Sequence, residues 1–321
     1  MAVPESLGLT RRTVLTGAAA LLAAGTAGLT APRPARAEGL PQVRAAAAGW
    51  AGSNGELLVL TADPATEADY ALRLLAATED PDAGAELGSS LPLPLPEGFH
   101  PHSMAALGDV LWVTGAVELA PDRVRPALVR VHESTAAHAE LPVPKAIRSG
   151  IATAITPIGD RGLAVVLEGC PDPHLTAISR SHLAVSKDHG RTWTGRPLAS
   201  GLGEGYGTVL TESDHGLFIA VVDGDGTQTV HTTAKTGVLR QAARLPDAGR
   251  PMAAVATDDH VRVFSDRDGT VAQTRFTAKG DILESSPDCG CSGEILAVPG
   301  RRGTWLETDG STIHIRSTDQ R

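Results

Sequence analysis

The stretch PMAAVATDDHVRVFSDRDGTVAQTRFTAKGD, residues 251–281, covers most of one structural repeat of this chain. Short apolar runs alternate in it with Gly and Asp turns, which is typical of β-strands and their connections. The turn Asp268-Gly269-Thr270 favours a tight hairpin, because Asp and Gly both tolerate a positive φ. A second turn follows at Thr277-Ala278-Lys279-Gly280-Asp281. Two hairpins within one repeat predict four strands.

Equivalent turns recur on both sides of this stretch. The Asp-Gly pair begins at positions 225, 268 and 309, in steps of 43 and 41 residues. In the same register, six apolar runs are expected to form innermost strands, at residues 45–52, 103–109, 150–160, 207–214, 251–258 and 293–300. A unit of about 47 residues is usual for a four-stranded propeller blade. The chain is therefore predicted to be all-β, a six-bladed β-propeller of four-stranded blades, with a seven-bladed ring as the alternative.

The octapeptide SKDHGRTW, at residues 186–193, begins 47 residues before the equivalent turn at Thr233. It matches the pattern Ser-x-Asp-x-Gly-x-Thr-Trp. This octapeptide resembles the Asp-box of the BNR repeat, which occurs in sialidase-like β-propellers. The resemblance implies a structural turn between the third and fourth strands of a blade. In that turn Asp188 hydrogen-bonds its own backbone and Trp193 packs between blades. The pattern is formed by Ser186, Asp188, Gly190, Thr192 and Trp193, and it has one full copy in the chain.

The closure of the predicted ring depends on both ends of the chain. The sequence stops at Arg321, within the turn that would precede the outer strand of the last blade. A blade without its outer strand leaves an exposed sheet edge. We expect the segment Leu40-Pro41-Gln42-Val43-Arg44 to supply that strand and close the ring.

The N-terminal residues predict an export signal. Arg11-Arg12 precede an apolar stretch at residues 14–29, and the small-residue site Ala35-Arg36-Ala37 follows it. This arrangement resembles a twin-arginine signal peptide, and the stretch is shorter than the about 20 apolar residues that a spanning helix needs. We expect residues 1–37 to be cleaved and residues 38–321 to form one secreted domain without a stable membrane span.

Composition argues against several classes of partner. The chain has a formal net charge of −9, and residues 1–37 carry a net charge of +3, so the exported part carries −12. An acidic surface argues against binding to nucleic acid or anionic lipid. Aromatic residues make up 3% of the chain, which argues against sites built from stacked rings.

Candidate binding residues gather on one face of the predicted ring, on the loops that join the second strand to the third and the fourth strand to the next blade. Three interpretations of its cysteines stay open, and one is that they remain free thiols. After export, Cys170 pairs with Cys289 or Cys291 and pins two loops together, with Cys170–Cys289 as the candidate disulfide, although Cys289 and Cys291 could also form a small strained ring. Alternatively, these cysteines join histidines of the face in binding copper or zinc. The binding-face residues are His100, His102, Asp172, His174, Tyr206 and Arg250, and the metal candidates are His100, His102, Cys170, Cys289 and Cys291.

A glycosidase is the enzymatic function that the resemblance suggests. Sialidase-type enzymes use a tyrosine nucleophile assisted by a glutamate, together with a proton donor and three arginines that bind the substrate carboxylate. The catalytic candidates here are Glu204, Tyr206 and Arg250. Glu204 and Tyr206 lie on one loop, whereas the family draws these groups from separate blades, and the family's Arg-Ile-Pro motif is absent.

These observations favour a monomeric, non-catalytic extracellular protein that binds a glycan, a cell-envelope component or a protein, with no cofactor. The alternative is a divergent glycosidase or a metal-dependent enzyme that uses the cysteines and histidines of the rim. Whether the chain is an enzyme stays open at this point.

Overall fold

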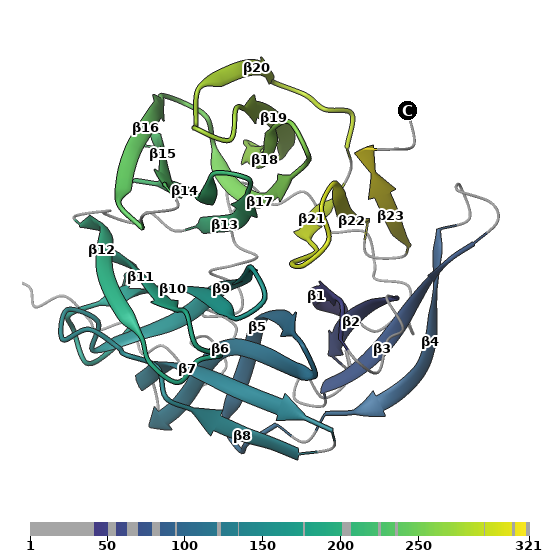
Figure 1. Ribbon diagram of the computed structural model, residues 1–321, viewed down its shortest axis with the longest axis vertical. Coiled ribbons are helices and arrows are strands. Elements are labelled where there is room, and N and C mark those ends of the chain that lie inside the picture. The colour runs from purple at the N-terminus through teal and green to yellow at the C-terminus, as the bar shows by residue number, and fades with distance from the viewer. Residues whose placement is uncertain are drawn as a thin grey trace, which may run out of the picture.

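The computed structural model places six antiparallel β-sheets around a common axis (Figure 1). It describes residues 42–50, 56–62, 70–78, 84–93, 95–120, 123–133, 135–175, 177–200, 207–223, 226–234, 237–291, 293–309 and 312–318. Each sheet consists of strands that are consecutive in the chain, so the sheets are the six blades of a β-propeller. The predicted all-β, six-bladed fold is confirmed.

The strands follow one another from blade to blade in chain order. The first three blades contain β1 (Gln42–Ala48), β2 (Leu57–Ala62), β3 (Tyr70–Ala77), β4 (Ala85–Pro92), β5 (Phe99–Leu107), β6 (Val110–Ala120), β7 (Arg123–His132), β8 (Thr135–Ala139), β9 (Ser149–Ile158), β10 (Gly162–Cys170), β11 (Arg180–Ser186) and β12 (Thr194–Ser200). The last three contain β13 (Thr208–Ser213), β14 (Gly216–Val222), β15 (Gln228–Thr233), β16 (Leu239–Leu245), β17 (Arg250–Ala256), β18 (Val261–Arg267), β19 (Thr270–Phe276), β20 (Ile282–Ser286), β21 (Glu294–Ala297), β22 (Thr304–Thr308) and β23 (Ile313–Ser317). No helix within these described residues is long and apolar enough to cross a membrane.

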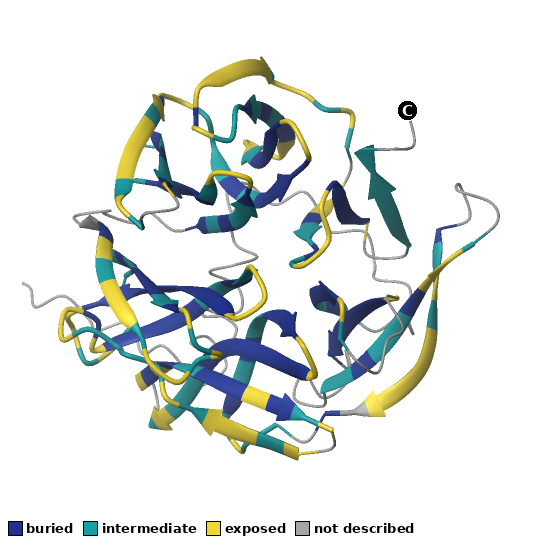
Figure 2. Ribbon diagram, in the orientation of Figure 1, coloured by how far each residue is buried: buried dark blue, intermediate teal, exposed yellow. Residues whose placement is uncertain are grey.

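The strands nearest the axis are β1, β5, β9, β13, β17 and β21, and each contacts the next around the ring. All six lie where the apolar runs of the sequence predict them. Burial explains the pattern, because the inner two strands of a blade pack on both faces and therefore read as continuous apolar runs. Every residue of β10 is buried, whereas the outer strand β20 is exposed along most of its length (Figure 2).

Apolar side chains from adjacent blades meet in separate clusters between the sheets. Phe218 of the fourth blade and Phe276 of the fifth are both fully buried, and their ring centroids lie 5.2 Å apart. A similar cluster joins the second and third blades and includes Trp112 and Trp193. Because dispersion and hydrophobic burial act between every such pair of sheets, the ring is stabilised blade against blade.

The predicted closure by an N-terminal strand is wrong. Gln42 and Val43 pair with Ala62 and Thr61 of β2, so the described part of the predicted closing segment begins the innermost strand of the first blade. Residues 40 and 41 lie outside the described residues. The physical reason is that residues 42–44 and the alanine run after them form one continuous strand, β1, so residues 42–44 cannot pair separately with the last blade. The last blade has three strands within the described part of the chain.

The first and last blades are joined mainly by side chains. An apolar cluster of both blades includes Val59, Leu75 and Leu306. Among the described residues, one backbone hydrogen bond crosses this interface, from the Ala48 N–H to the Pro299 carbonyl oxygen at 3.1 Å. Within the described residues the ring therefore closes by packing between the first and last sheets, and no strand is shared between its two ends.

The turn at residues 186–193 joins the third and fourth strands of its blade, β11 and β12, as predicted. The Asp188 carboxylate accepts hydrogen bonds from the Thr192 backbone N–H at 2.8 Å and the Thr192 hydroxyl at 2.6 Å. The hydroxyl of Thr192 is the main cause that lowers the pKa of Asp188 to about 2. Trp193 donates its indole N–H to the Gly190 carbonyl at 3.1 Å and packs against the cluster between the second and third blades. These hydrogen bonds hold the turn in a fixed conformation between β11 and β12.

Candidate functional site

The antiparallel order of the strands brings one set of chain positions to a single face. The innermost strand of each blade begins there and the second strand ends there, and we call it the upper face. It holds the starts of β5 and β17, with His100, His102 and Arg250, and the end of β10, with Glu168 and Cys170. The turn at residues 186–193 lies at the opposite face, because β11 runs away from the upper face.

Four of the six innermost strands carry a β-bulge near the upper face. The ladder with the second strand skips one residue in each, namely Arg44, His102, Thr153 and Met252. A bulge leaves one residue out of the pairing and re-aims its side chain. The four bulges thus free four different side chains at corresponding places around the axis.

Glu168 is the buried polar centre of the upper face. It lies on β10 between Ile151 of β9 and Ser181 of β11, and only 1% of its surface is exposed. Its Oε1 atom accepts a hydrogen bond of 2.6 Å from the Thr208 hydroxyl, which lies 3.0 Å from the Ser181 hydroxyl. Two blades are therefore linked by a chain of three polar side chains.

The other carboxylate oxygen of Glu168 and the hydroxyl of Thr153 are also buried. Within the described residues neither atom has a hydrogen-bond partner of good geometry. The Thr153 hydroxyl nevertheless lowers the pKa of Glu168, so it lies close to the carboxylate. Buried polar atoms without a partner are uncommon in native proteins and often mark functional positions.

Two glycines bring the strands together beside Glu168. Gly150 of β9 and Gly169 of β10 pair directly across the ladder. A Cβ atom on Gly150 would lie 2.3 Å from the Glu168 carbonyl oxygen, and one on Gly169 would lie 2.2 Å from the Ser149 carbonyl oxygen. Only glycine allows two backbones to approach so closely.

Burial dominates the electrostatics of Glu168. Desolvation raises its pKa above the ordinary value of 4.5, and the hydroxyls of Thr208 and Thr153, the Arg250 charge and the Gly207 N–H oppose this shift. The Arg250 side chain lies over Gly207, where a Cβ atom would come within 3.1 Å of the arginine Cγ. The site thus combines a carboxyl group that favours its neutral form with a guanidinium group at the rim.

The raised pKa of Glu168 predicts a dependence of stability on pH. Above pH 4.5 the unfolded chain releases this proton, whereas the folded state retains it until its raised pKa is passed, so folding becomes less favourable as the pH rises through that window. Glu168→Gln has no such proton, so its melting temperature relative to the wild type should increase as the pH rises above about 4.5. Thermal melts across this range measure the difference, with the exposed Glu86→Gln as control. A constant difference across the range would contradict the assignment.

The second group on the upper face consists of two histidines and an arginine. Burial, the Arg44 charge and His100 lower the pKa of His102 to about 3. Burial also lowers the pKa of His100, against the opposing effect of Glu118. Both imidazoles are therefore neutral at physiological pH, and each has one nitrogen that donates and one that accepts a hydrogen bond.

Asp172 and His174 lie on the loop that follows β10. The Asp172 carboxylate accepts a hydrogen bond of 2.9 Å from the His174 backbone N–H, and the Cys170 thiol contacts the His174 carbonyl oxygen at 3.3 Å. Both residues are exposed at the rim. These contacts within residues 170–174 stabilise the turn that follows β10.

The candidate disulfide Cys170–Cys289 is wrong. Cys289 pairs with Cys291, while Cys170 is buried and free. Cys170 belongs to the third blade, whereas the other two lie between the fifth and sixth blades, on the loop from β20 to β21. No three His, Cys, Asp or Glu residues among those the structure describes come together as a metal site, so the five metal candidates are not gathered.

Sequence reasoning located part of this site. Arg250, His100 and His102 lie on the upper face as predicted, whereas Glu204 and Tyr206 lie outside the described residues. Glu168, Thr208 and Arg44 were missed as site residues. For Glu168 a signal exists, because it is the only charged residue in the buried run GLAVVLEGC of β10.

The comparisons with known proteins concern architecture. No protein-family model matches the sequence, and no curated protein sequence matches it either. The PQQ-bound aldose sugar dehydrogenase from Streptomyces coelicolor is similar in structure, with 13% identity over 88% of this chain and 95% of that chain and a TM-score of 0.55. A mutant Aleuria aurantia lectin in complex with Fucalpha1-6GlcNAc has 12% identity over 88% and 93% of the two chains and a TM-score of 0.56. At such low identities the likeness shows a shared fold, and this chain is a β-propeller.

Proposed function

We propose that this protein is an exported propeller that binds a carbohydrate on its upper face. The observation that carries the proposal is the composition of that face. Neutral His102 adjoins His100 and Arg44, and Arg250 adjoins the buried Glu168. Export and cleavage after residue 37 rest on the N-terminal sequence, which lies outside the described residues.

The chemistry of these groups matches that of sugar hydroxyls. A hydroxyl both donates and accepts hydrogen bonds, and a neutral imidazole offers one site of each kind. Guanidinium groups add donors whose geometry is fixed. Arg44, His100, His102 and Arg250 are all partly exposed, so they can contact a ligand, and Arg250 lies close enough to the buried Glu168 for its charge to lower the pKa of that carboxyl.

The fold comparisons support the same class of ligand. One similar structure is named as an aldose sugar dehydrogenase and another is a lectin in complex with a fucosylated sugar. The low identities transfer no residue role to this chain. A cell-envelope glycan is the extracellular carbohydrate that an exported bacterial protein would meet, and binding as a monomer without turnover is part of the proposal.

A glycan array with the exported part, residues 38–321, tests the proposal. We expect His102→Ala and Arg250→Ala each to weaken binding of the recognised sugar by about tenfold or more, because each removes a hydrogen-bonding group worth about 1.4 kcal/mol. The matched control is His215→Ala, since His215 is exposed on the turn between β13 and β14 at the opposite face. An array without binding, or binding that neither variant weakens, would overturn the proposal.

A second candidate function is favoured by one observation. Burial keeps the pKa of Glu168 above its ordinary range, which is the environment of a proton donor in glycoside hydrolysis. Incubating the sugar identified on the array with the protein separates the two functions. Hydrolysis that Glu168→Gln abolishes indicates a glycosidase, whereas intact sugar indicates a binding protein.

A further inference from the structure

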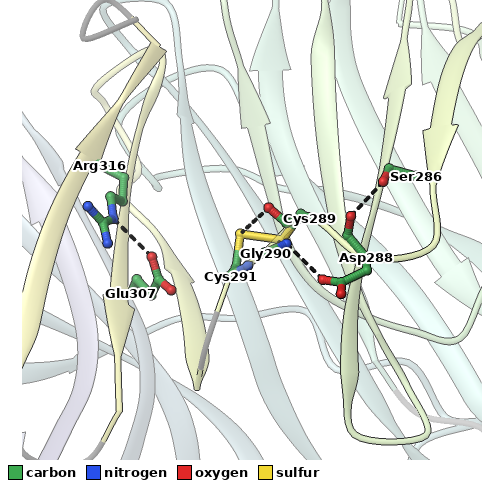
Figure 3. Close-up of a disulfide and its surroundings, with 7 residues drawn as sticks. All are labelled: Ser286, Asp288, Cys289, Gly290, Cys291, Glu307 and Arg316. Carbon is green, nitrogen blue, oxygen red and sulfur yellow. Dashed lines mark hydrogen bonds and ion pairs between the residues drawn. A yellow bond between two sulfur atoms is a disulfide. The ribbon is translucent and has the colours of Figure 1, made fainter.

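The disulfide between Cys289 and Cys291 lies on the upper face, on the loop from β20 to β21 (Figure 3). It links residues two positions apart, so it joins no separate loops or blades. In the chain-entropy model the stabilisation by a disulfide grows with the length of the loop it closes, so this bond is among the least stabilising kind. The disulfide between Cys289 and Cys291 is therefore expected to contribute little to the stability of the fold.

The pair is also accessible, unlike the third cysteine. Cys289 and Cys291 are both half-buried at the rim, whereas Cys170 is buried. Gly290 between them is exposed, and no atom lies within 4 Å of the place where its Cβ would be. Both cysteines pack against the apolar cluster that includes Ile295 and Trp305. A partner chain can therefore approach the two sulfurs over Gly290.

The loop has hydrogen bonds that do not depend on the disulfide. The Asp288 carboxylate accepts the Gly290 backbone N–H at 2.7 Å, and the Ser286 hydroxyl donates to the Asp288 carbonyl oxygen at 2.6 Å (Figure 3). The Cys289 backbone N–H donates to the Val271 carbonyl oxygen of β19 at 2.9 Å. These bonds would hold the loop in place after the sulfur–sulfur bond opens.

The two sulfurs differ in their contacts, since Sγ of Cys291 lies 3.8 Å from the Cys289 carbonyl oxygen. The backbone N–H of Cys291 donates to the Sγ atom of Cys289 at 3.3 Å. A hydrogen bond to sulfur stabilises a thiolate more than a neutral thiol, and a stabilised thiolate is the better leaving group. Cys289 is thus the leaving sulfur, and Cys291 is the sulfur that an incoming thiolate attacks.

We propose that Cys289 and Cys291 form a redox-active pair that exchanges its disulfide with the dithiol of a protein or peptide at the upper face. The substrate thiolate bonds to Sγ of Cys291, and the bond to Cys289 breaks to release its thiolate. The second substrate thiolate then attacks the first substrate sulfur and releases the thiolate of Cys291. The substrate loses two electrons and becomes a disulfide, while its two thiol protons end on Cys289 and Cys291.

The test uses the exported part of the chain and a synthetic peptide with two thiols. We expect the oxidised protein to convert the peptide to its disulfide in an equimolar amount, and Cys289→Ser and Cys291→Ser each to lower the initial rate by about 100-fold, to the rate in buffer. Cys170→Ser is the matched control, and it should retain the wild-type rate because Cys170 is buried outside the pair. A rate that depends on Cys170, or that survives Cys289→Ser, would overturn the proposal.

A second measurement covers the case in which a variant misfolds. The wild-type protein is equilibrated in buffers with a rising ratio of reduced to oxidised glutathione, and the thiols are labelled and counted by mass spectrometry. We expect the disulfide of Cys289 and Cys291 to become reduced in buffers that still contain both reduced and oxidised glutathione. The circular dichroism spectrum of the protein should stay unchanged. A pair that stays oxidised in reduced glutathione alone, or opens only as the protein unfolds, contradicts the proposal. Neither readout involves sugar binding, so the result is independent of the proposed function.

Discussion

Gly150→Ala is expected to lower the free energy of unfolding by about 3 kcal/mol or more, because it forces apart two strands that have no room to separate. The new Cβ would lie 2.3 Å from the Glu168 carbonyl oxygen and 2.9 Å from the Cα atom of Gly169. Both atoms belong to the backbone of β10, whose residues are all buried. Relief of the clash must therefore move a central strand, and with it the Glu168 side chain.

Urea unfolding followed by circular dichroism measures this effect. Gly88→Ala is the matched control, because Gly88 also lies within a strand, has no positive φ, and its new Cβ would meet no atom closer than 3.3 Å. We expect Gly88→Ala to change the free energy of unfolding by less than about 1 kcal/mol. Equal stabilities of the two variants would show that the close approach of β9 and β10 is not required.

Leu306→Ala is expected to cost about 3 kcal/mol, since it removes a fully buried side chain from the interface that closes the ring. Leu306 belongs to β22 of the last blade and packs in one cluster with Val59 and Leu75 of the first blade. Because one backbone hydrogen bond crosses this interface in the described part of the chain, a cavity there weakens the apolar packing that joins the two ends of the ring.

Thermal and urea unfolding of Leu306→Ala test this closure. The control is Leu283→Ala on β20, whose side chain is 53% exposed, and its loss should change stability by less than about 0.5 kcal/mol. Combining Leu306→Ala with Val59→Ala adds a check, because neighbours that share a cavity are not additive. Additive losses would indicate that the two residues do not share one interface.

Much of the fold could be predicted because its signals are local. The turns at Asp268-Gly269 and Thr277–Asp281 each depend on a few adjacent residues, and the structure places them between β18 and β19 and between β19 and β20. The closure could not be predicted in the same way. Whether Gln42 pairs within the first blade or the last depends on contacts between distant segments. The alternation of apolar residues predicts a strand but does not show which strand it pairs with.

The candidate site shows the same division. His102 and Arg250 were predicted to lie on one face because the order of strands fixes which loops share it. Glu168 becomes central through its neighbours Thr208 and Thr153, which lie on other strands and gather only in the folded ring. The pairing of Cys289 with Cys291 depends likewise on which loops lie close together, and Cys170 lies in a different blade.

The bulges at Arg44, His102, Thr153 and Met252 have a consequence for how this scaffold can change. Each of these residues stands outside the hydrogen-bonded ladder, so its replacement leaves the pairing of the innermost strand intact. The four freed side chains and the pairing of the innermost strands are therefore encoded at separate positions of the same strands. Randomising these four codons would vary the chemistry at the axis in a library whose members keep one common frame.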